Sequence, residues 1–353
     1  MRTLLSVLLI GVPVTLILSL VGVSEGMSED AQNRTRATGA DIVIHGSQAA
    51  SAVTYSGAPL PEGYTRKLAE QPHVKLAVGI IVHPLEFPLN MMGIDQAQFD
   101  AMSGGFTYLE GGPLRPGQPF DMLLDKPYAD QQKKHAGDTM HLLNNDWHVA
   151  GIIAPGKLAR VVVPKATLQD LDSAPGKLSL IYLKLDDPAR ADAVVEQLRQ
   201  QFPNLKIDTM AFQLSQFAPD NIASVRVFRY VVIGIGVVIG FAVVCLTMYM
   251  AVLQRTREIG ILKSLGGSKG FILRIMLTEA AGLGIGGTIV GILLSYGARW
   301  AISTFVPASF PMIIVQSWWV KAFAITMAGA LLGALYPGLS AARHDPIEAL
   351  AYE

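Results

Sequence analysis

Four long apolar stretches dominate the hydrophobic pattern of this chain. They cover residues 4–23, 230–253, 275–298 and 320–342. A helix needs about 20 apolar residues to cross a bilayer core about 30 Å thick, and each stretch meets that length. The pattern therefore predicts a membrane protein with four transmembrane helices, and it leaves residues 24–226 as a long insertion between the first helix and the second.

The insertion alternates short apolar runs with turn signals, which is typical of a folded α/β domain and not of a linker. Strands are expected at residues 40–45, 74–83, 147–153, 159–163 and 178–185, and helices at 62–70 and 189–202. Because residues 111–119 are rich in proline and glycine, we expect a joint between two subdomains there. The predicted fold class is membrane α-helical, with four transmembrane helices and an α/β periplasmic (extracytoplasmic) domain inserted between helices 1 and 2.

The first apolar stretch is compatible with a secretory signal or with an uncleaved anchor. The apolar region of a signal is about 7–15 residues long and is followed by a cleavage site of small residues. The stretch over 4–23 is longer, and the Val-Gly-Val-Ser-Glu sequence at its end offers no such site. We therefore expect an anchor helix that remains in the protein.

Basic residues in the short loops predict the orientation. The loop between the second and third stretches contains Arg255, Arg257, Lys263, Lys269 and Arg274. The loop over 303–317, between the third and fourth stretches, has no charged residue. Lysine and arginine concentrate in cytoplasmic loops. We therefore expect a multi-pass membrane protein with both termini in the cytoplasm and residues 24–226 outside.

Composition narrows the class of protein. Of the 353 residues, 51% are hydrophobic and 16% are charged. This composition is more apolar than that of a soluble domain and more polar than that of a chain wholly in lipid, so it indicates a protein with both kinds of region. Lysine plus arginine equal aspartate plus glutamate at 28 each, so no nucleic acid is expected as a partner. The single cysteine, Cys245, lies in an apolar stretch, which excludes an intrachain disulfide and does not indicate redox or zinc chemistry.

Two glycine patterns resemble nucleotide sites but lack essential parts. Residues 151–158 (Gly-Ile-Ile-Ala-Pro-Gly-Lys-Leu) have P-loop spacing up to Lys157, but Leu158 replaces the hydroxyl residue that holds magnesium. The GxGxxG pattern of residues 282–287 lies inside a transmembrane stretch with no strand before it. We therefore expect no cofactor in this chain.

Glycines at i, i+4 spacing recur in the last three transmembrane stretches. The pairs are Gly236 and Gly240, Gly287 and Gly291, and Gly329 and Gly333. Small residues at this spacing let membrane helices approach closely, although glycine is also common in such helices in general. We expect these positions to serve helix packing.

The insertion contains one group of residues that are able to bind a metal. These are His135, Asp138, His141, Asp146 and His148. A two-residue turn at 144–145 would place His141 opposite His148, but a shift of one residue would separate them. Since the spacing fixes no third ligand, we expect a solvated hairpin and no metal site. No hydrolase or metalloprotease motif is present either, so we expect no catalytic residues.

The most informative segments are a loop and the C-terminal tail. The loop, QRTREIGILKSLGGSKGFILRIMLTEA, runs from Gln254 to Ala280 and predicts a short basic helix that ends at Gly266–Gly267. Such a helix fits the groove of a partner protein or the surface of an anionic membrane. In the tail, Asp345 is placed to cap a helix that has Pro346 at its first position and Glu348 three residues on.

These two segments resemble the permeases of macrolide-efflux (MacB-like), lipoprotein-releasing and cell-division (FtsX-like) ABC transporters. In that family, the stretch similar to residues 255–266 is the coupling helix between the second and third spans, and the stretch similar to 345–350 closes the chain. The layout of one span, an outer domain and three spans is also similar. This sequence departs from the family in having no fused ATPase domain and almost nothing before the first span.

The resemblance implies three parts. Residues 1–23 form transmembrane helix 1, residues 24–226 a MacB-like core domain, and residues 227–353 an FtsX-like permease domain, with a coupling helix at 254–267 and a cytoplasmic tail at 343–353. The implied ATPase contact consists of Arg255, Arg257, Glu258, Ile261, Lys263, Gly266 and Gly267.

The resemblance also implies that the protein lies in the bacterial inner membrane. The implied partners follow from the same family. They are two copies of an ABC ATPase subunit, which would hold Mg-ATP, a second permease copy or a paralogue, and membrane lipids. A periplasmic adaptor or lipoprotein is a further candidate. The implied activity is non-catalytic transmission of ATP-driven motion to the outer domain, for export or extraction of a hydrophobic or lipid-linked cargo. The alternative is a regulator that controls a cell-wall hydrolase without moving a substrate.

Overall fold

The computed structural model describes residues 2–46, 60–86, 89–254, 256–265, 267–305 and 310–343. The chain divides into two compact units. The helical unit comprises Met1–Gly26, Ala223–Val306 and Met312–Glu353, and the sheet unit comprises Met27–Ile222 and Pro307–Pro311. Each unit contains its own clusters of buried apolar residues.

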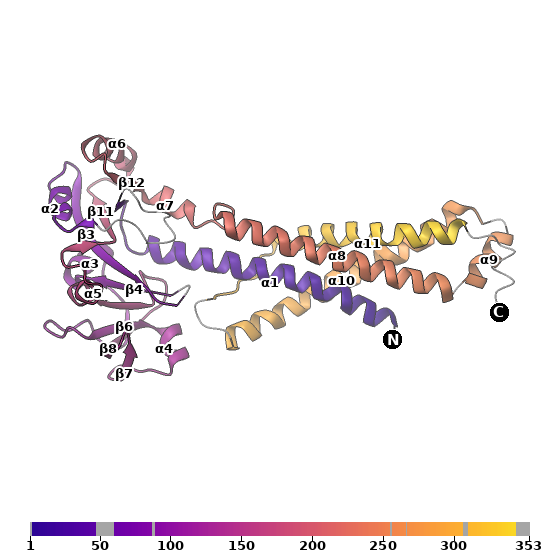
Figure 1. Ribbon diagram of the computed structural model, residues 1–353, viewed down its shortest axis with the longest axis horizontal. Coiled ribbons are helices and arrows are strands. Elements are labelled where there is room, and N and C mark those ends of the chain that lie inside the picture. The colour runs from indigo at the N-terminus through magenta and orange to yellow at the C-terminus, as the bar shows by residue number, and fades with distance from the viewer. Residues whose placement is uncertain are drawn as a thin grey trace. The chain divides into compact units, whose positions relative to one another are not determined.

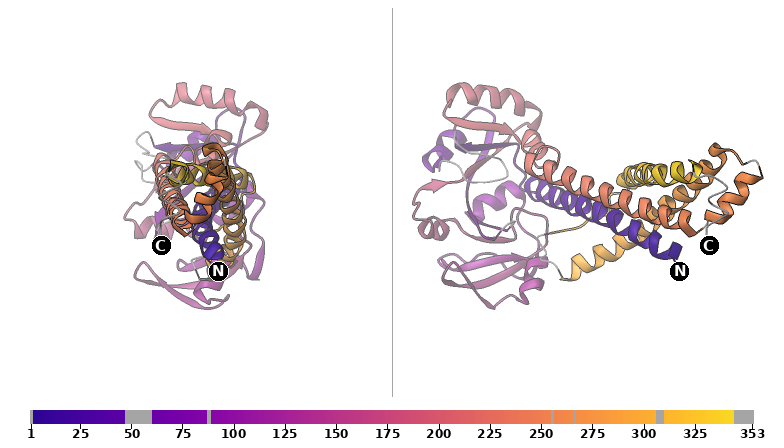
Figure 2. Two further views of the ribbon diagram at one scale, coloured as in Figure 1. Left: turned by 90° about the vertical axis from the view of Figure 1, so that its right-hand side faces the viewer. Right: turned by 45° about the vertical axis from the view of Figure 1, so that its right-hand side comes forward.

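The helical unit is built from four long helices that lie side by side (Figure 1 and Figure 2). These are α1 (Arg2–Arg36), α8 (Ala223–Gln254), α10 (Lys269–Phe305) and α11 (Ser317–Arg343), and the short α9 (Thr256–Ser264) follows α8. All four long helices are apolar and long enough to cross a membrane. The prediction of four transmembrane helices is therefore confirmed. The first is longer than its apolar stretch, because helical hydrogen bonding continues through the polar residues 24–36.

The sheet unit contains short helices and strands (Figure 1). The elements are β1 (Ile42–Gly46), β2 (Leu60–Pro61), α2 (Gly63–Ala69), β3 (Val74–Pro84), β4 (Asn90–Ile94), α3 (Gln96–Ser103), β5 (Tyr108–Gly111), β6 (Asp121–Asp125), α4 (Lys126–Gln132), β7 (Thr139–Leu142), β8 (Asn145–Ile153), β9 (Val161–Pro164), α5 (Lys165–Leu171), β10 (Lys177–Leu178), β11 (Leu180–Leu185), η1 (Pro188–Arg190), α6 (Ala191–Gln201), β12 (Leu205–Thr209) and α7 (Met210–Gln216). The expected α/β domain is confirmed.

Ten of these strands form one mixed sheet in the order β12-β1-β11-β3-β4-β9-β6-β8-β5, with β7 paired to β8. The pairs β4–β9 and β6–β8 are parallel and the other pairs are antiparallel. Strand β3 is long enough to pair with β11 through its first part and with β4 through its last. The two halves of the sheet are thus joined at β3. Residues 111–119, expected as a subdomain joint, instead lead from β5 to β6 within one half.

The core of the sheet unit lies on both faces of the central strands. All five residues of β6 are buried, as are Val161, Val162 and Val163 of β9. Strands covered on both faces are apolar throughout, because neither row of side chains meets water. Trp147 of β8 is the largest fully buried side chain. It lies in a cluster with residues of β4, β6 and β9.

Candidate functional site

The loop predicted to contain a short helix forms α9, which follows α8 directly. Ile259 of α9 is buried and packs against Val252 of α8 and against Ile272 and Met276 of α10. One apolar side chain therefore fixes α9 to the adjoining ends of two transmembrane helices.

Three other apolar side chains of this segment are exposed. Ile261 is 44% exposed, Leu262 37% and Leu265 80%. Glu258, one turn before Leu262, is exposed as well. Burying apolar surface of this kind provides about 25 cal/mol per Å², so the segment presents a surface suited to a partner protein or to a membrane surface.

The end of α9 is closed by backbone hydrogen bonds. Leu265 N donates to Ile261 O at 3.0 Å, and Gly267 N donates to Leu262 O at 2.9 Å. The second bond spans five residues, as in a Schellman C-cap. Arg255 and Gly266 lie outside the described residues, as does the tail with Asp345, and the side chains of two further predicted contact residues, Arg257 and Lys263, are not described.

Glycines bring α1 and α10 into close contact. A Cβ atom added at Gly291 would lie 2.5 Å from Cβ of Val14, and one at Gly287 would overlap the side chain of Ile10. Thr15 Oγ1 donates to Gly291 O at 3.1 Å across the same contact. Two backbones this close require residues without side chains.

The other predicted glycines differ in what surrounds them. A Cβ at Gly333 would lie 2.8 Å from the carbonyl oxygen of Phe241 in α8, and one at Gly236 would lie 3.1 Å from Cδ1 of Ile17 in α1. Gly240 and Gly329 have more space, and with Gly236 they line a small apolar cavity between α1, α8 and α11. In the pair of α8 and in the pair of α11, one glycine therefore lies close to a neighbouring helix and the other has space around it.

This geometry yields a prediction for helix packing. The substitution Gly291→Ala is expected to destabilise the protein by about 1–3 kcal/mol, because overpacking at a close helix contact forces the backbones apart. Gly297→Ala in the same helix is the control, since a Cβ there meets no described atom within 4 Å. Thermal unfolding of the full chain in detergent measures both. Equal midpoints for the two variants would contradict the prediction.

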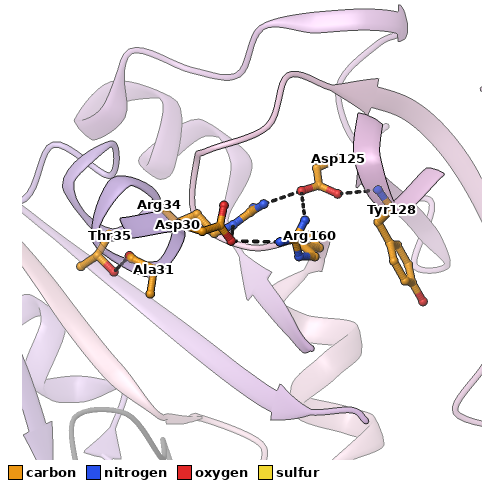
Figure 3. Close-up of polar contacts among 7 residues, drawn as sticks. All are labelled: Asp30, Ala31, Arg34, Thr35, Asp125, Tyr128 and Arg160. Atoms are coloured by element: carbon orange, nitrogen blue, oxygen red, sulfur yellow. Dashed lines mark hydrogen bonds and ion pairs between the residues drawn. The ribbon is translucent and has the colours of Figure 1, made fainter. Parts of the chain in front are cut away.

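A buried ionic network fixes the end of α1 within the sheet unit (Figure 3). Arg34 Nη2 donates to Asp125 Oδ2 at 2.6 Å, and Arg34 Nε donates to Asp30 Oδ2 at 2.9 Å. Arg160 donates to the same two carboxylate oxygens, at 3.0 Å from Asp30 and 3.3 Å from Asp125. The network thus holds two guanidinium groups and two carboxylates, so its formal charges balance.

Asp125 is the centre of this network and is fully buried. Its other oxygen, Oδ1, accepts a hydrogen bond from Tyr128 N at 3.1 Å and so caps the first turn of α4. One carboxylate therefore holds α1, the strand β6 that ends at Asp125, and α4. Two segments 91 residues apart in the sequence are joined by the Arg34–Asp125 bond.

The other candidates from the sequence have structural roles. The hairpin turns at Leu143–Asn144, both at positive φ, so His141 pairs with Asp146 and not with His148. Among the described residues, no group of histidine, cysteine and carboxylate side chains is able to hold a metal. In the P-loop-like segment, Lys157 donates to the carbonyl oxygens of Ser103 and Gly105 at the end of α3.

The burial of His45 predicts a pH-dependent stability of the sheet unit. It is 3% exposed in β1, and burial lowers its pKa, an effect that nearby Lys206 increases. At a pH below 6.5, the ordinary pKa of histidine, the unfolded chain therefore binds a proton at this position more readily than the folded protein does. We expect stability to fall as the pH drops below about 6.5, with a slope of at most about 1.4 kcal/mol per pH unit from this group.

Replacement of the histidine isolates this contribution. In His45→Gln, the decline in stability between pH 7.5 and pH 5.5 is expected to be shallower than in the unaltered chain, because no proton is taken up at this position. Urea unfolding of the full chain in detergent at both values measures the slope. Parallel pH profiles in the two proteins would contradict the assignment.

Comparisons with known families match both units. The model of the MacB-like periplasmic core domain matches residues 3–201, and that of the FtsX-like permease C-terminal region matches residues 230–346. The crystal structure of the periplasmic region of MacB from Actinobacillus actinomycetemcomitans is 16% identical, with a TM-score of 0.38, and the match covers 50% of this chain and 92% of that one.

Relatives with known names are similar over different lengths. The macrolide export ATP-binding/permease protein MacB of Salmonella choleraesuis (strain SC-B67) is 25% identical over 385 residues, which cover 100% of this chain and 58% of that protein. The uncharacterized ABC transporter permease YknZ of Bacillus subtilis (strain 168) is 41% identical over 123 residues, or 34% of this chain and 30% of the relative. The chain thus spans less than two thirds of either relative.

The MacB-like model by itself matches more than half of the chain. The resemblance inferred from the loop is confirmed, and the chain belongs to the MacB-like and FtsX-like family of ABC transporter permeases.

Proposed function

We propose that this permease transmits ATP-driven motion from separate ATPase subunits to its extracytoplasmic domain. The observation that carries the proposal is α9, where Ile259 packs on the transmembrane helices while Ile261, Leu262 and Leu265 are exposed. A partner that binds the exposed side of α9 moves the helices to which the buried side is fixed. The test is recovery of the ATPase subunit with the full chain after the exposed side has been altered.

The ionic network supports the second step of the proposal. Helix α1 is continuous over Arg2–Arg36, and its last turns are fixed to β6 and β9 through Asp125 and Arg160. A helix held by several charge-assisted hydrogen bonds transmits a displacement instead of slipping past its contact. Motion of the first span is thereby delivered to the sheet of the outer domain.

The proposed assembly contains two ATPase subunits, which hold Mg-ATP, and either two copies of this permease or one copy with a paralogue. We place Arg255, Arg257, Glu258, Lys263, Gly266 and Gly267 at the ATPase contact together with Ile261. The cargo is a hydrophobic or lipid-linked molecule. The permease itself hydrolyses no ATP, since Leu158 stands where a P-loop needs a hydroxyl residue and Lys157 binds backbone carbonyls.

The proposed topology places the sheet unit outside and α9 in the cytoplasm. A Cys245→Ser chain that carries Gln197→Cys is expected to react with an impermeant maleimide in intact cells. The same chain with Ser268→Cys is expected to react only after the cells are opened. Both positions are exposed. Labelling of the Ser268→Cys chain in intact cells, with none of the Gln197→Cys chain, would reverse the topology.

A further inference from the structure

Three titratable or charged side chains meet where β6 pairs with β8 in the sheet unit. Asp121 is the first residue of β6, and His148 lies opposite it in β8. Arg115 comes from segment 112–120, which connects β5 to β6. The side chain of Asp121 is 1% exposed, whereas those of Arg115 and His148 are 53% and 39% exposed. One buried carboxylate therefore faces two partners that water reaches.

Asp121 holds segment 112–120 through Arg115. Arg115 Nε donates to Asp121 Oδ2 at 2.8 Å, Nη2 donates to Oδ1 at 2.7 Å, and the backbone N donates to Oδ2 at 3.1 Å. Burial by itself raises the pKa of a carboxyl group, but these bonds hold the pKa of Asp121 below its ordinary value. The carboxylate therefore stays charged at neutral and mildly acidic pH. Because residues 115–120 are exposed, the three bonds fix the start of the exposed part of the segment.

His148 shares two of the same atoms. Its Nδ1 lies 3.1 Å from Asp121 Oδ1 and 3.0 Å from Arg115 Nη2. A guanidinium N–H only donates and a carboxylate oxygen only accepts, whereas imidazole Nδ1 accepts or donates according to its proton. Neutral His148 adds no charge, and its Nδ1 is able to accept from Arg115. Protonated His148 donates to Asp121 and places a second positive charge beside the guanidinium group, so two cations compete for one carboxylate.

The elements packed around His148 bring few other charges to it. Helix α4 packs with Trp147 and Val149, whose side chains point away from the face that carries His148. Strand β7 places Thr139 opposite His148. The remaining charged groups of α4, β5, β6, β7 and β8 have partners of their own, in the pairs Lys126–Asp130, Glu110–His135, Arg34–Asp125 and His141–Asp146. A charge on His148 therefore acts mainly on Asp121 and Arg115.

The far end of the segment is held independently of this cluster. Thr167 Oγ1 donates to Pro119 O at 2.6 Å, and the ring of Phe120 packs edge to face on Trp147 with 5.3 Å between the ring centres. At the near end, Leu114 is buried in the core. Loss of the Arg115–Asp121 contact therefore loosens residues 115–118 and leaves the rest of the segment in place.

We propose that His148 is a pH-sensitive switch for segment 112–120. Histidine changes charge between pH 5 and 8. At the upper end of this range, the neutral ring leaves Arg115 on Asp121, and the segment is held. At the lower end, the imidazolium takes Asp121 Oδ1 and repels Arg115, which loosens residues 115–118. The sheet unit lies outside in the proposed topology, so the switch responds to the pH outside the cell.

The test is hydrogen exchange of the full chain in detergent at pH 7.5 and pH 5.5. Rates are expressed as protection relative to an unstructured chain, because intrinsic exchange itself changes with pH. The amide of Arg115 reports directly, since it donates to Asp121 Oδ2, and Gln118 N donates to Arg115 O at 3.1 Å. Protection of these amides is expected to fall about fivefold at pH 5.5, the size of effect typical of a partly exposed charge contact. In His148→Gln it is expected to be the same at both values.

His141→Gln is the matched control, because it removes the other histidine of the same hairpin, which is 66% exposed and pairs with Asp146. It is expected to keep the fall in protection at 115–118. His45→Gln is also expected to keep it, which separates the switch from the loss of overall stability at low pH. Arg115→Gln is expected to lower protection at both values and to remove the difference between them. Unchanged protection in the unaltered chain, or an equal fall in His148→Gln, would overturn the proposal.

Discussion

Replacing Ile261 and Leu265 by glutamate is expected to abolish recovery of the ATPase subunit with the permease. Both side chains are exposed, at 44% and 80%, so the fold tolerates the change. In a docked contact they become buried, and central contact residues commonly cost 2 kcal/mol or more when lost. A loss of about 2 kcal/mol lowers affinity roughly thirtyfold, and glutamate adds the cost of burying a charge.

The measurement is pull-down of the ATPase by the full chain in detergent, together with ATP turnover of the recovered complex. Leu109→Glu is the matched control, because Leu109 is 52% exposed in β5 and lies in the other unit. A helix that rests on membrane lipid and not on the ATPase would lose nothing in detergent. Equal recovery and equal turnover in the Ile261→Glu/Leu265→Glu chain and the unaltered chain would therefore refute the coupling assignment.

The transmembrane helices were predictable because length and apolarity alone define them. Within the outer domain, the predicted elements are those with long apolar or amphipathic patterns. Strand β3, with its eleven residues, and helix α6, with a clear apolar face, are examples. Strands β4, β6 and β12 were not predicted, because polar residues or glycine interrupt their short apolar runs. The equally short β1 and β9 were predicted, because each contains three consecutive β-branched residues.

The hairpin register was not predictable from the turn sequence. Asn144–Asn145 and Leu143–Asn144 are alternative two-residue turns, and they differ by one residue. The structure adopts the second, in which Trp147 is fully buried and its Nε1 donates to Leu142 O at 2.9 Å. In this register Trp147 pairs with Met140, and His141 faces Asp146.

The ionic network was missed for a different reason. Its acidic and basic residues come from α1, from β6 and from Arg160 just before β9, and no local spacing links Arg34 to Asp125. The one signal in the sequence is the i,i+4 pair of Asp30 and Arg34, which continues a helical pattern beyond the apolar stretch. That pair indicates a longer helix, but it does not identify the strand to which the helix is fixed.

Removing the carboxylate at the centre of this network is expected to destabilise the outer domain severely. The substitution Asp125→Ala leaves the buried Arg34 and Arg160 with Asp30 as the remaining carboxylate of the network, and it removes the cap of α4 at Tyr128. Loss of one partner from a buried ion pair commonly costs about 3–5 kcal/mol. Hydrogen exchange of the full chain in detergent is expected to show faster exchange in β6 and β9, with α8 and α10 unaffected.

Two further variants separate the causes of that loss. Asp125→Asn retains an oxygen that caps α4 but removes the negative charge, so it is expected to be intermediate, with the difference from Asp125→Ala near the 0.5–2 kcal/mol typical of an N-cap. Asp146→Ala breaks a surface contact, since Asp146 is 74% exposed and lies 2.8 Å from His141. It is expected to change stability by less than about 0.5 kcal/mol. If Asp125→Ala were as mild as this surface control, the buried network would not be what fixes α1 to the sheet.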